Sequence, residues 1–99
     1  SAAVSNLYTL TTAGWAQQSD GRYAQSISVP DVTVDTAIVI VDVNLTGTDL
    51  ESDNAVLAAW AISDGSGPAS QNVTQGNGSL TFYCLSVPAV NIPINVGMI

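Results

Sequence analysis

The sequence predicts an all-β fold, a small antiparallel β-sandwich of jelly-roll-like form with one short helix. Three observations lead to this prediction. Apolar and polar residues alternate at a period of two through most of the chain. Short clusters of Gly, Pro, Asp and Asn, which favour turns, separate the alternating segments. The length of 99 residues suits one domain, and we expect residues 1–99 to be a single β-sandwich domain.

Six segments have strand patterns, namely 7–12, 23–29, 37–45, 58–62, 80–84 and 92–98. Residues 37–41 are apolar on both faces, which predicts a central strand. Residues 72–74 are expected to pair with the 80–84 strand as a hairpin. Pro93 cannot donate a hydrogen bond to a neighbouring strand, so we expect the last strand at a sheet edge or with this proline turned outward.

One helix is predicted. Thr48 and Glu51 have the spacing of a capping box, in which a hydroxyl and a carboxylate accept hydrogen bonds from each other's backbone N–H groups. The apolar residues that follow extend this helix to Ala58.

Three acidic residues in this region, Asp49, Glu51 and Asp53, also invite a calcium interpretation. An EF-hand loop counted from Asp49 would need Gly in place of Asn54 and Glu in place of Trp60. We therefore interpret the acidic residues as favourable charges in the first turn of a helix, and we predict no metal site.

Composition excludes many functions. The net charge is −7, the chain has no His and no Lys, and Arg22 is its single basic residue. Nucleic-acid binding and attachment to anionic membranes both need clustered basic residues. Without His or Lys there is no Ser-His-Asp triad, no Cys-His pair and no Schiff-base lysine, and a zinc site lacks ligands. The longest apolar run, 37–41, is too short to span a bilayer. We predict a protein that is not an enzyme and has no cofactor, nucleic-acid partner or membrane insertion.

The motif Asp35-Thr36-Ala37 resembles the Asp-Thr-Gly of small dimeric aspartic proteases. Its third residue is Ala rather than Gly, and no glycine-rich flap follows. We interpret Asp35 as a turn residue before a strand.

Aromatic residues are the candidate ligand contacts. An aromatic ring beside amide and hydroxyl groups suits a carbohydrate, and we select Trp15 and Tyr23 as candidate ligand-contacting residues. Trp15 lies between glycine and polar residues, so a core position and a ligand contact both stay open for it.

Other large apolar residues are expected in the core or at an interface. These core-or-interface candidates are Trp60, Phe82, Ile92, Ile94 and Val96.

Cys84 shares a strand face with Leu80 and Phe82, which predicts a buried, reduced and unreactive thiol.

Several motifs occur in a characteristic order. They are LTTAGW at 10–15, VPDVT at 29–33, GSLTFYC at 78–84 and IPINV at 92–96. This order, from about Leu7 to the end, resembles the C-terminal domains of phage tail, baseplate and tail-fibre proteins, and of collagen-like fibre proteins, of Firmicutes genomes and prophages. The resemblance implies a small β-sandwich head on a fibrous, usually trimeric protein, with no catalytic residues. It also implies that residues 1–99 are the C-terminal piece of a longer fibrous protein. Relative to such domains, residues 64–77 look like an extension.

The expected function is therefore that of a non-enzymatic virion or tail structural domain, for host-surface attachment or fibre trimerisation. The alternative is a carbohydrate-binding module of a secreted bacterial protein. A host cell-surface glycan is the expected ligand, and the expected location is the virion tail or outside the cell. Because 46% apolar residues accompany nine charged ones, the residues alone predict self-association with two-fold or three-fold symmetry. The resemblance favours a homotrimer.

Overall fold

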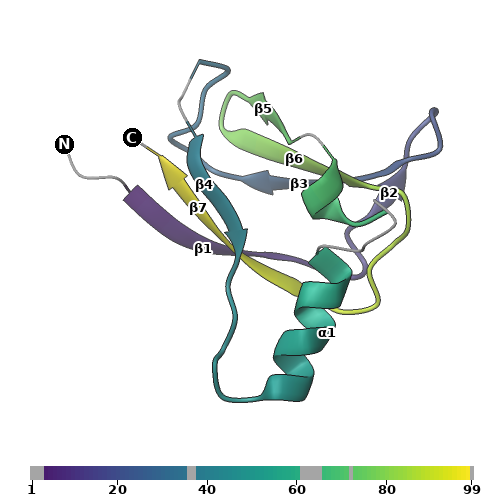
Figure 1. Cartoon of the computed structure of the whole chain (residues 1–99). Coiled ribbons are helices and arrows are strands. Elements are labelled where there is room, and N and C mark those ends of the chain that lie inside the picture. The colour runs from purple at the N-terminus through teal and green to yellow at the C-terminus, as the bar shows by residue number, and fades with distance from the viewer. Residues whose placement is uncertain (1–3, 36–37, 61–65, 72, 99) are drawn as a thin grey trace.

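The computed structural model describes residues 4–35, 38–60, 66–71 and 73–98. Within them the chain forms the strands β1 (Val4–Leu10), β2 (Ala16–Gln17), β3 (Tyr23–Ser28), β4 (Ile38–Val43), β5 (Thr74–Gly76), β6 (Ser79–Cys84) and β7 (Ile92–Met98), the helix α1 (Leu50–Trp60) and the short 3-10 helix η1 (Pro68–Ser70). These strands make a three-stranded sheet, β1-β7-β4, and a four-stranded sheet, β2-β3-β6-β5. All neighbouring strands are antiparallel. The predicted fold class, an antiparallel sandwich with one short helix, is confirmed (Figure 1).

The core lies between the two sheets. Ile92, Ile94 and Val96 of β7 are fully buried, and so are Leu80 and Phe82 of β6. Residues from both sheets belong to one apolar cluster, which is what a period of two on each strand produces when each sheet buries one face.

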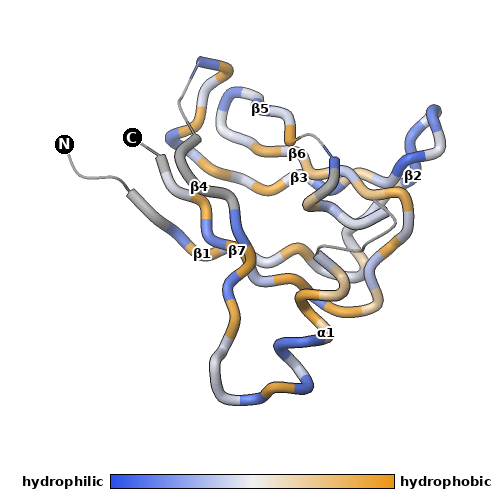
Figure 2. The backbone as a smooth tube through the Cα atoms, viewed as in Figure 1, coloured by the Kyte–Doolittle hydropathy of each residue, from blue (hydrophilic) through white to orange (hydrophobic). Residues whose placement is uncertain are grey.

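Helix α1 closes one end of this core, and part of the sequence prediction was wrong here. Residues 58–60, predicted as the start of a strand, form the last turn of α1, and residues 61–62 lie outside the described part of the chain. The first half of α1 is largely hydrophilic, and its second half, nearer the sheets, is apolar (Figure 2). Its buried Trp60 contacts Phe82, with ring centroids 6.4 Å apart.

The order of the three-stranded sheet corrects the prediction for the 37–45 strand and decides between the two alternatives for Pro93. Pro93 alternates with the buried Ile92 and Ile94, so its ring lies on the outer face, which is the second alternative. The strand predicted to be central, β4, lies at an edge among the described residues, and β7, which contains Pro93, lies in the centre. The sheet tolerates Pro93 because it is opposite the end of β4. Its carbonyl accepts a hydrogen bond from the Asn44 N–H (2.8 Å), just after β4 ends. The missing N–H of Pro93 therefore leaves one end position unpaired and no gap inside the ladder.

Two of the sequence motifs hold the four-stranded sheet in place. Segment 29–33 follows β3 and lies against the turn between β5 and β6. The Val29 N–H donates to the Gly78 carbonyl (2.9 Å), and the Gly78 N–H donates to the Val32 carbonyl. Gly78 has a φ of +80°, a conformation that glycine adopts without strain. Val29 and Val32 are buried, so this segment adds apolar contacts as well as hydrogen bonds.

Candidate functional site

The outer face of the four-stranded sheet is the candidate site. Strand alternation and register place the hydroxyl groups of Ser26, Ser28, Thr74, Ser79, Thr81 and Tyr83 on this face, which we call the hydroxyl face. Thr74, Thr81 and Ser26 form one row across three strands. The Ser26 and Thr81 hydroxyl oxygens lie 2.7 Å apart and share a hydrogen bond. Each of these hydroxyls can act as donor or acceptor, which is the property that polyhydroxylated ligands require.

Arg22 stands at one end of the hydroxyl face. Its guanidinium carbon lies 4.2 Å from the centroid of the Tyr83 ring, a distance typical of a cation–π contact. Arg22 immediately precedes β3, so the strand fixes the backbone from which this side chain extends.

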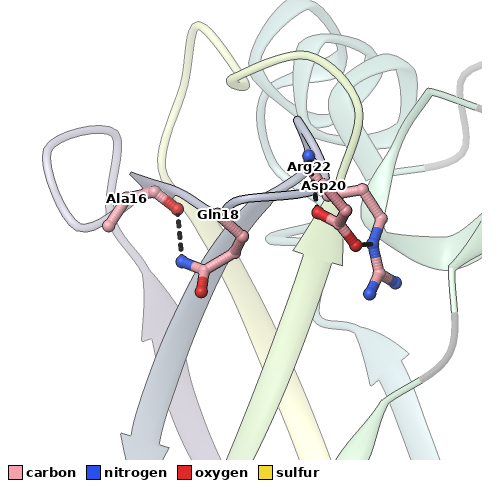
Figure 3. A network of polar contacts seen from close by, with 4 residues as sticks. All are labelled: Ala16, Gln18, Asp20 and Arg22. Atoms are coloured by element: carbon pink, nitrogen blue, oxygen red, sulfur yellow. Dashed lines mark hydrogen bonds and ion pairs between the residues drawn. The ribbon is translucent and has the colours of Figure 1, made fainter.

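Asp20 holds Arg22 in this position. The Asp20 carboxylate accepts from the Arg22 backbone N–H (3.0 Å) and from the Arg22 Nε–H (2.8 Å), as Figure 3 shows. The turn itself is closed by hydrogen bonds between Gln18 and its neighbours, and Gly21 occupies its positive-φ position. These hydrogen bonds from Arg22, the backbone one first, lower the pKa of Asp20, so the carboxylate is ionised at neutral pH. In Figure 3 the two terminal nitrogens of Arg22 point away from Asp20.

The strands of this face lack charged residues, as β1 and β7 also do. The strands β2, β3, β5 and β6 contain no Asp, Glu, Lys or Arg. The chain nevertheless has a net charge of −7, and all eight of its acidic residues lie outside these strands. The hydroxyl face is therefore a neutral surface with the Arg22–Asp20 ion pair at its end. It is an open surface, and the described residues enclose no pocket.

The predicted ligand-contacting residues lie elsewhere. Tyr23 is partly buried on the inner face of β3, opposite Cys84. Trp15 is partly buried and packs against the apolar core, with its indole N–H buried and without a hydrogen-bond partner. The structure therefore does not bring these two residues to the hydroxyl face.

Sequence reasoning missed the hydroxyl face, although a signal for it exists. Ser26 and Ser28 alternate along one predicted strand, and Ser79 and Thr81 alternate along another. The register that places them side by side is a tertiary property.

The core-or-interface candidates are all buried within the chain. Trp60 is 7% exposed, and Phe82, Ile92, Ile94 and Val96 are fully buried.

Three of the four acidic residues that suggested calcium or catalysis have a local environment that explains them, and the fourth, Glu51, lies exposed in the first turn of α1. Asp49 Oδ1 accepts from the N–H groups of Glu51 and Ser52, so Asp49, rather than the predicted Thr48, caps the helix. Asp53 is buried and closes the loop before the helix, as described below. Asp35 lies exposed in a turn, where its N–H donates to the Thr33 hydroxyl. Within the described residues no three His, Cys, Asp or Glu side chains converge as metal ligands.

Comparison with family models, with curated protein sequences and with solved structures gives no match. In the part of the chain that the structure describes, no helix is both long enough and apolar enough to cross a membrane.

Proposed function

We propose that this chain is a non-enzymatic structural domain of a phage-type tail or fibre protein, serving host-surface attachment or fibre trimerisation. In the attachment role, the hydroxyl face binds a glycan of the host surface. The protein then acts in the virion tail or outside the cell.

The observation that carries the attachment role is the combination of neutral hydroxyl rows with one fixed arginine. Sugars present many hydroxyl groups and few charges, so a partner surface needs matched donors and acceptors more than charge. The Ser26–Thr81 pair supplies hydroxyls whose protons can reorient toward a ligand. Arg22 adds donors in a fixed orientation, because Asp20 and the Tyr83 ring already hold its side chain.

A binding assay on purified host cell wall, or on a glycan array, tests this role. Arg22→Ala and the double change Ser26→Ala/Thr81→Val are expected to weaken binding about tenfold, the effect of one or two lost hydrogen bonds. Ser52→Ala, which removes an exposed hydroxyl from α1, is the matched control and should bind like the unmodified chain. Binding that is equal in all four proteins would show that the hydroxyl face is not the attachment surface.

The alternative function is a carbohydrate-binding module of a secreted bacterial protein, which would use the same face. The gene sequence upstream of Ser1 separates the two. Fibre repeats, heptads or Gly-X-Y triplets there favour the tail protein, whereas a catalytic domain favours the module.

A further inference from the structure

We infer that copies of this chain associate through the two long edges of the three-stranded sheet, with β1 of one copy pairing with β4 of the next. This inference rests on the proposed assembly role and is independent of glycan attachment, which uses the other sheet.

The edge strands of the two sheets differ in length. In the four-stranded sheet the edge strands β2 and β5 have two and three residues. In the three-stranded sheet the edge strands β1 and β4 have seven and six residues. Short edge strands are a common protection against pairing with another chain, and long ones are open to it. The four-stranded sheet is protected in this way, and within the described residues the three-stranded sheet is not.

The long edges also lack most chemical protection. Charged residues, especially Lys, and proline on an edge oppose strand addition. β1 contains no charged residue and no proline, and β4 contains one charged residue, Asp42. A β-bulge between Ile38 and Ile40 gives β4 some irregularity. β1, whose Leu7 side chain is 64% exposed, has no such feature among its paired residues.

The hydrogen bond between Asn44 and Pro93 fixes which backbone groups of β1 face the free edge. Because the Pro93 carbonyl is directed toward β4, the Thr9–Pro93 pair is a non-hydrogen-bonded one. Hydrogen-bonded and non-hydrogen-bonded pairs alternate along an antiparallel ladder. The N–H and C=O groups of Ser5, Leu7 and Thr9 are therefore directed away from β7 and toward the free edge.

The same alternation applies on the other side of the sheet. Asp42, opposite Asn95, pairs with β7, so the backbone groups of Val41 and Val43 face the free edge of β4. The Val43 N–H donates to the Asp42 carboxylate at 2.8 Å, which agrees with its direction away from β7. The free edge of β1 thus presents a row of backbone donors and acceptors. On β4 the Asp42 carboxylate already accepts from the Val43 N–H, so the free edge of β4 offers the N–H and C=O of Val41 and the C=O of Val43, which are complementary to the row on β1.

Pairing unlike edges determines the symmetry. A contact between β1 and β4 is heterologous, and repeated contacts of this kind close into a ring when the rotation between copies allows it and form an open filament when it does not. Our inference is the closed ring, and a mass that keeps growing with protein concentration would indicate a filament and overturn it. Contacts between like edges, β1 with β1 or β4 with β4, give a two-fold dimer instead. A ring of three has a mass of about 30 kDa, three times the 10.1 kDa of one chain.

Sedimentation equilibrium on two substitutions at one position tests the pairing. Leu7→Pro removes both the exposed leucine side chain and the N–H that faces the edge, whereas Leu7→Thr removes the side chain alone. We expect the unmodified chain and Leu7→Thr to form the ring, and Leu7→Pro to sediment as a monomer near 10.1 kDa. Circular dichroism establishes that each variant is folded.

Several results would overturn the inference. The first is that the unmodified chain is monomeric. The second is a mass of about 20 kDa, which would indicate a dimer through like edges. The third is loss of assembly in both variants, which would show that the leucine side chain holds the copies together, and the fourth is that neither variant loses assembly. If Leu7→Pro does not fold, amide hydrogen exchange on the unmodified chain replaces it. The amides of Ser5, Leu7 and Thr9 should exchange fast in dilute protein and slowly at assembling concentrations, and unchanged rates count against the pairing. The glycan-binding assay described under the proposed function is also carried out on Leu7→Pro. Its result shows whether attachment is kept when assembly is lost, so the two roles can fail separately.

Discussion

Gln25 is a buried polar residue whose side chain takes the place of a missing strand partner. Its Oε1 accepts from the Thr11 N–H and its Nε2 donates to the Thr11 carbonyl, both at 2.9 Å. These two bonds satisfy the backbone just after β1 ends, in the LTTAGW motif. Gly14 in the same motif is required for space, since a Cβ there would lie 2.7 Å from Gln25 Cδ and Oε1.

Gly14→Ala should therefore destabilise the fold by about 1–3 kcal/mol, because Gln25 cannot move aside without losing its bonds to Thr11. Gly76→Ala is the matched control. Its Cβ would meet the Ser79 Oγ at 2.8 Å, the end of a side chain that can rotate away. Urea denaturation measures both free energies of unfolding. Equal costs would show that the Gln25–Thr11 arrangement does not constrain Gly14.

Cys84 is a free thiol, fully buried on the inner face of β6. Burial raises its pKa from 9.0 to about 11, because the thiolate loses hydration. The thiol should react slowly with a labelling reagent in the native protein and completely after denaturation. Rapid labelling of the native chain would contradict the buried position.

The same pKa gives a pH dependence of stability. A group whose pKa is higher in the folded state than in the unfolded state binds its proton more tightly when folded. Its contribution to stability is complete below pH 9 and decreases as the pH rises toward about 11. Cys84→Ala should remove this decrease, which thermal melts between pH 8 and 11 would detect.

Among the elements, α1 shows how a short apolar pattern can be misinterpreted. Trp60 was predicted on a strand face, but Val56 and Trp60, one helical turn apart, both pack on the core. A run of a few apolar residues fits either period, and the helix prevails because its last turn buries Trp60 against Phe82.

The loop before α1 depends on Asp53. Its Oδ1 accepts from the N–H and hydroxyl of Thr46, and its Oδ2 accepts from the Gly47 N–H, each at 2.9 Å. Gly47 has a φ of +72°, so this turn needs glycine. The hydrogen bond from the Thr46 backbone is the main cause that lowers the pKa of Asp53.

Asp53→Asn should lower the melting temperature, because an amide places a donor where one of these N–H groups needs an acceptor. The stability that Asp53 provides is present above its ordinary pKa of 3.8 and is lost as the pH falls through its lower folded pKa. The variant should therefore lose less stability on acidification than the unmodified chain. Glu51→Gln, an exposed change in the same helical turn, is the control.

A chelator should leave the melting temperatures of the unmodified chain, Asp53→Asn and Glu51→Gln unchanged. A fall in melting temperature that calcium restores would contradict the structural role of these carboxylates.

At the scale of the whole molecule, the two sheets expose different chemistry. The four-stranded sheet has short edges and a neutral, hydroxyl-bearing outer face, which suits a polar ligand. The three-stranded sheet has long, almost uncharged edges, which suit a second copy. The acidic residues lie outside the strands of the first sheet, and one of them, Asp42, lies on the second.

Net charge should make self-association depend on salt. Each copy carries a charge of −7, so copies repel one another at low ionic strength. Raising the salt from 0.01 M to 0.15 M shortens the Debye length from about 30 Å to about 8 Å and should shift association to lower protein concentration. Sedimentation at the two salt concentrations measures this. Weaker association at high salt would indicate that attractive charge pairs, rather than strand edges, hold the copies together.

The sequence by itself determined the fold class, most of the strand segments that bury one face, and the absence of His and Lys chemistry. These follow from residue type and from a period of two, both of which are local properties. The position of a strand in a sheet is not local. β4 was predicted to be central because residues 37–41 are apolar on both faces, and Pro93 left an edge or an outward-facing position open for β7, yet among the described residues β4 lies at an edge and β7 in the centre. The hydroxyl face also depends on register, because Ser26 and Thr81 are 55 residues apart in the chain and meet only when β3 pairs with β6. Only the tertiary structure decided these features, since pairing between distant segments is chosen by the packing of the whole core and not by the residues of any one strand.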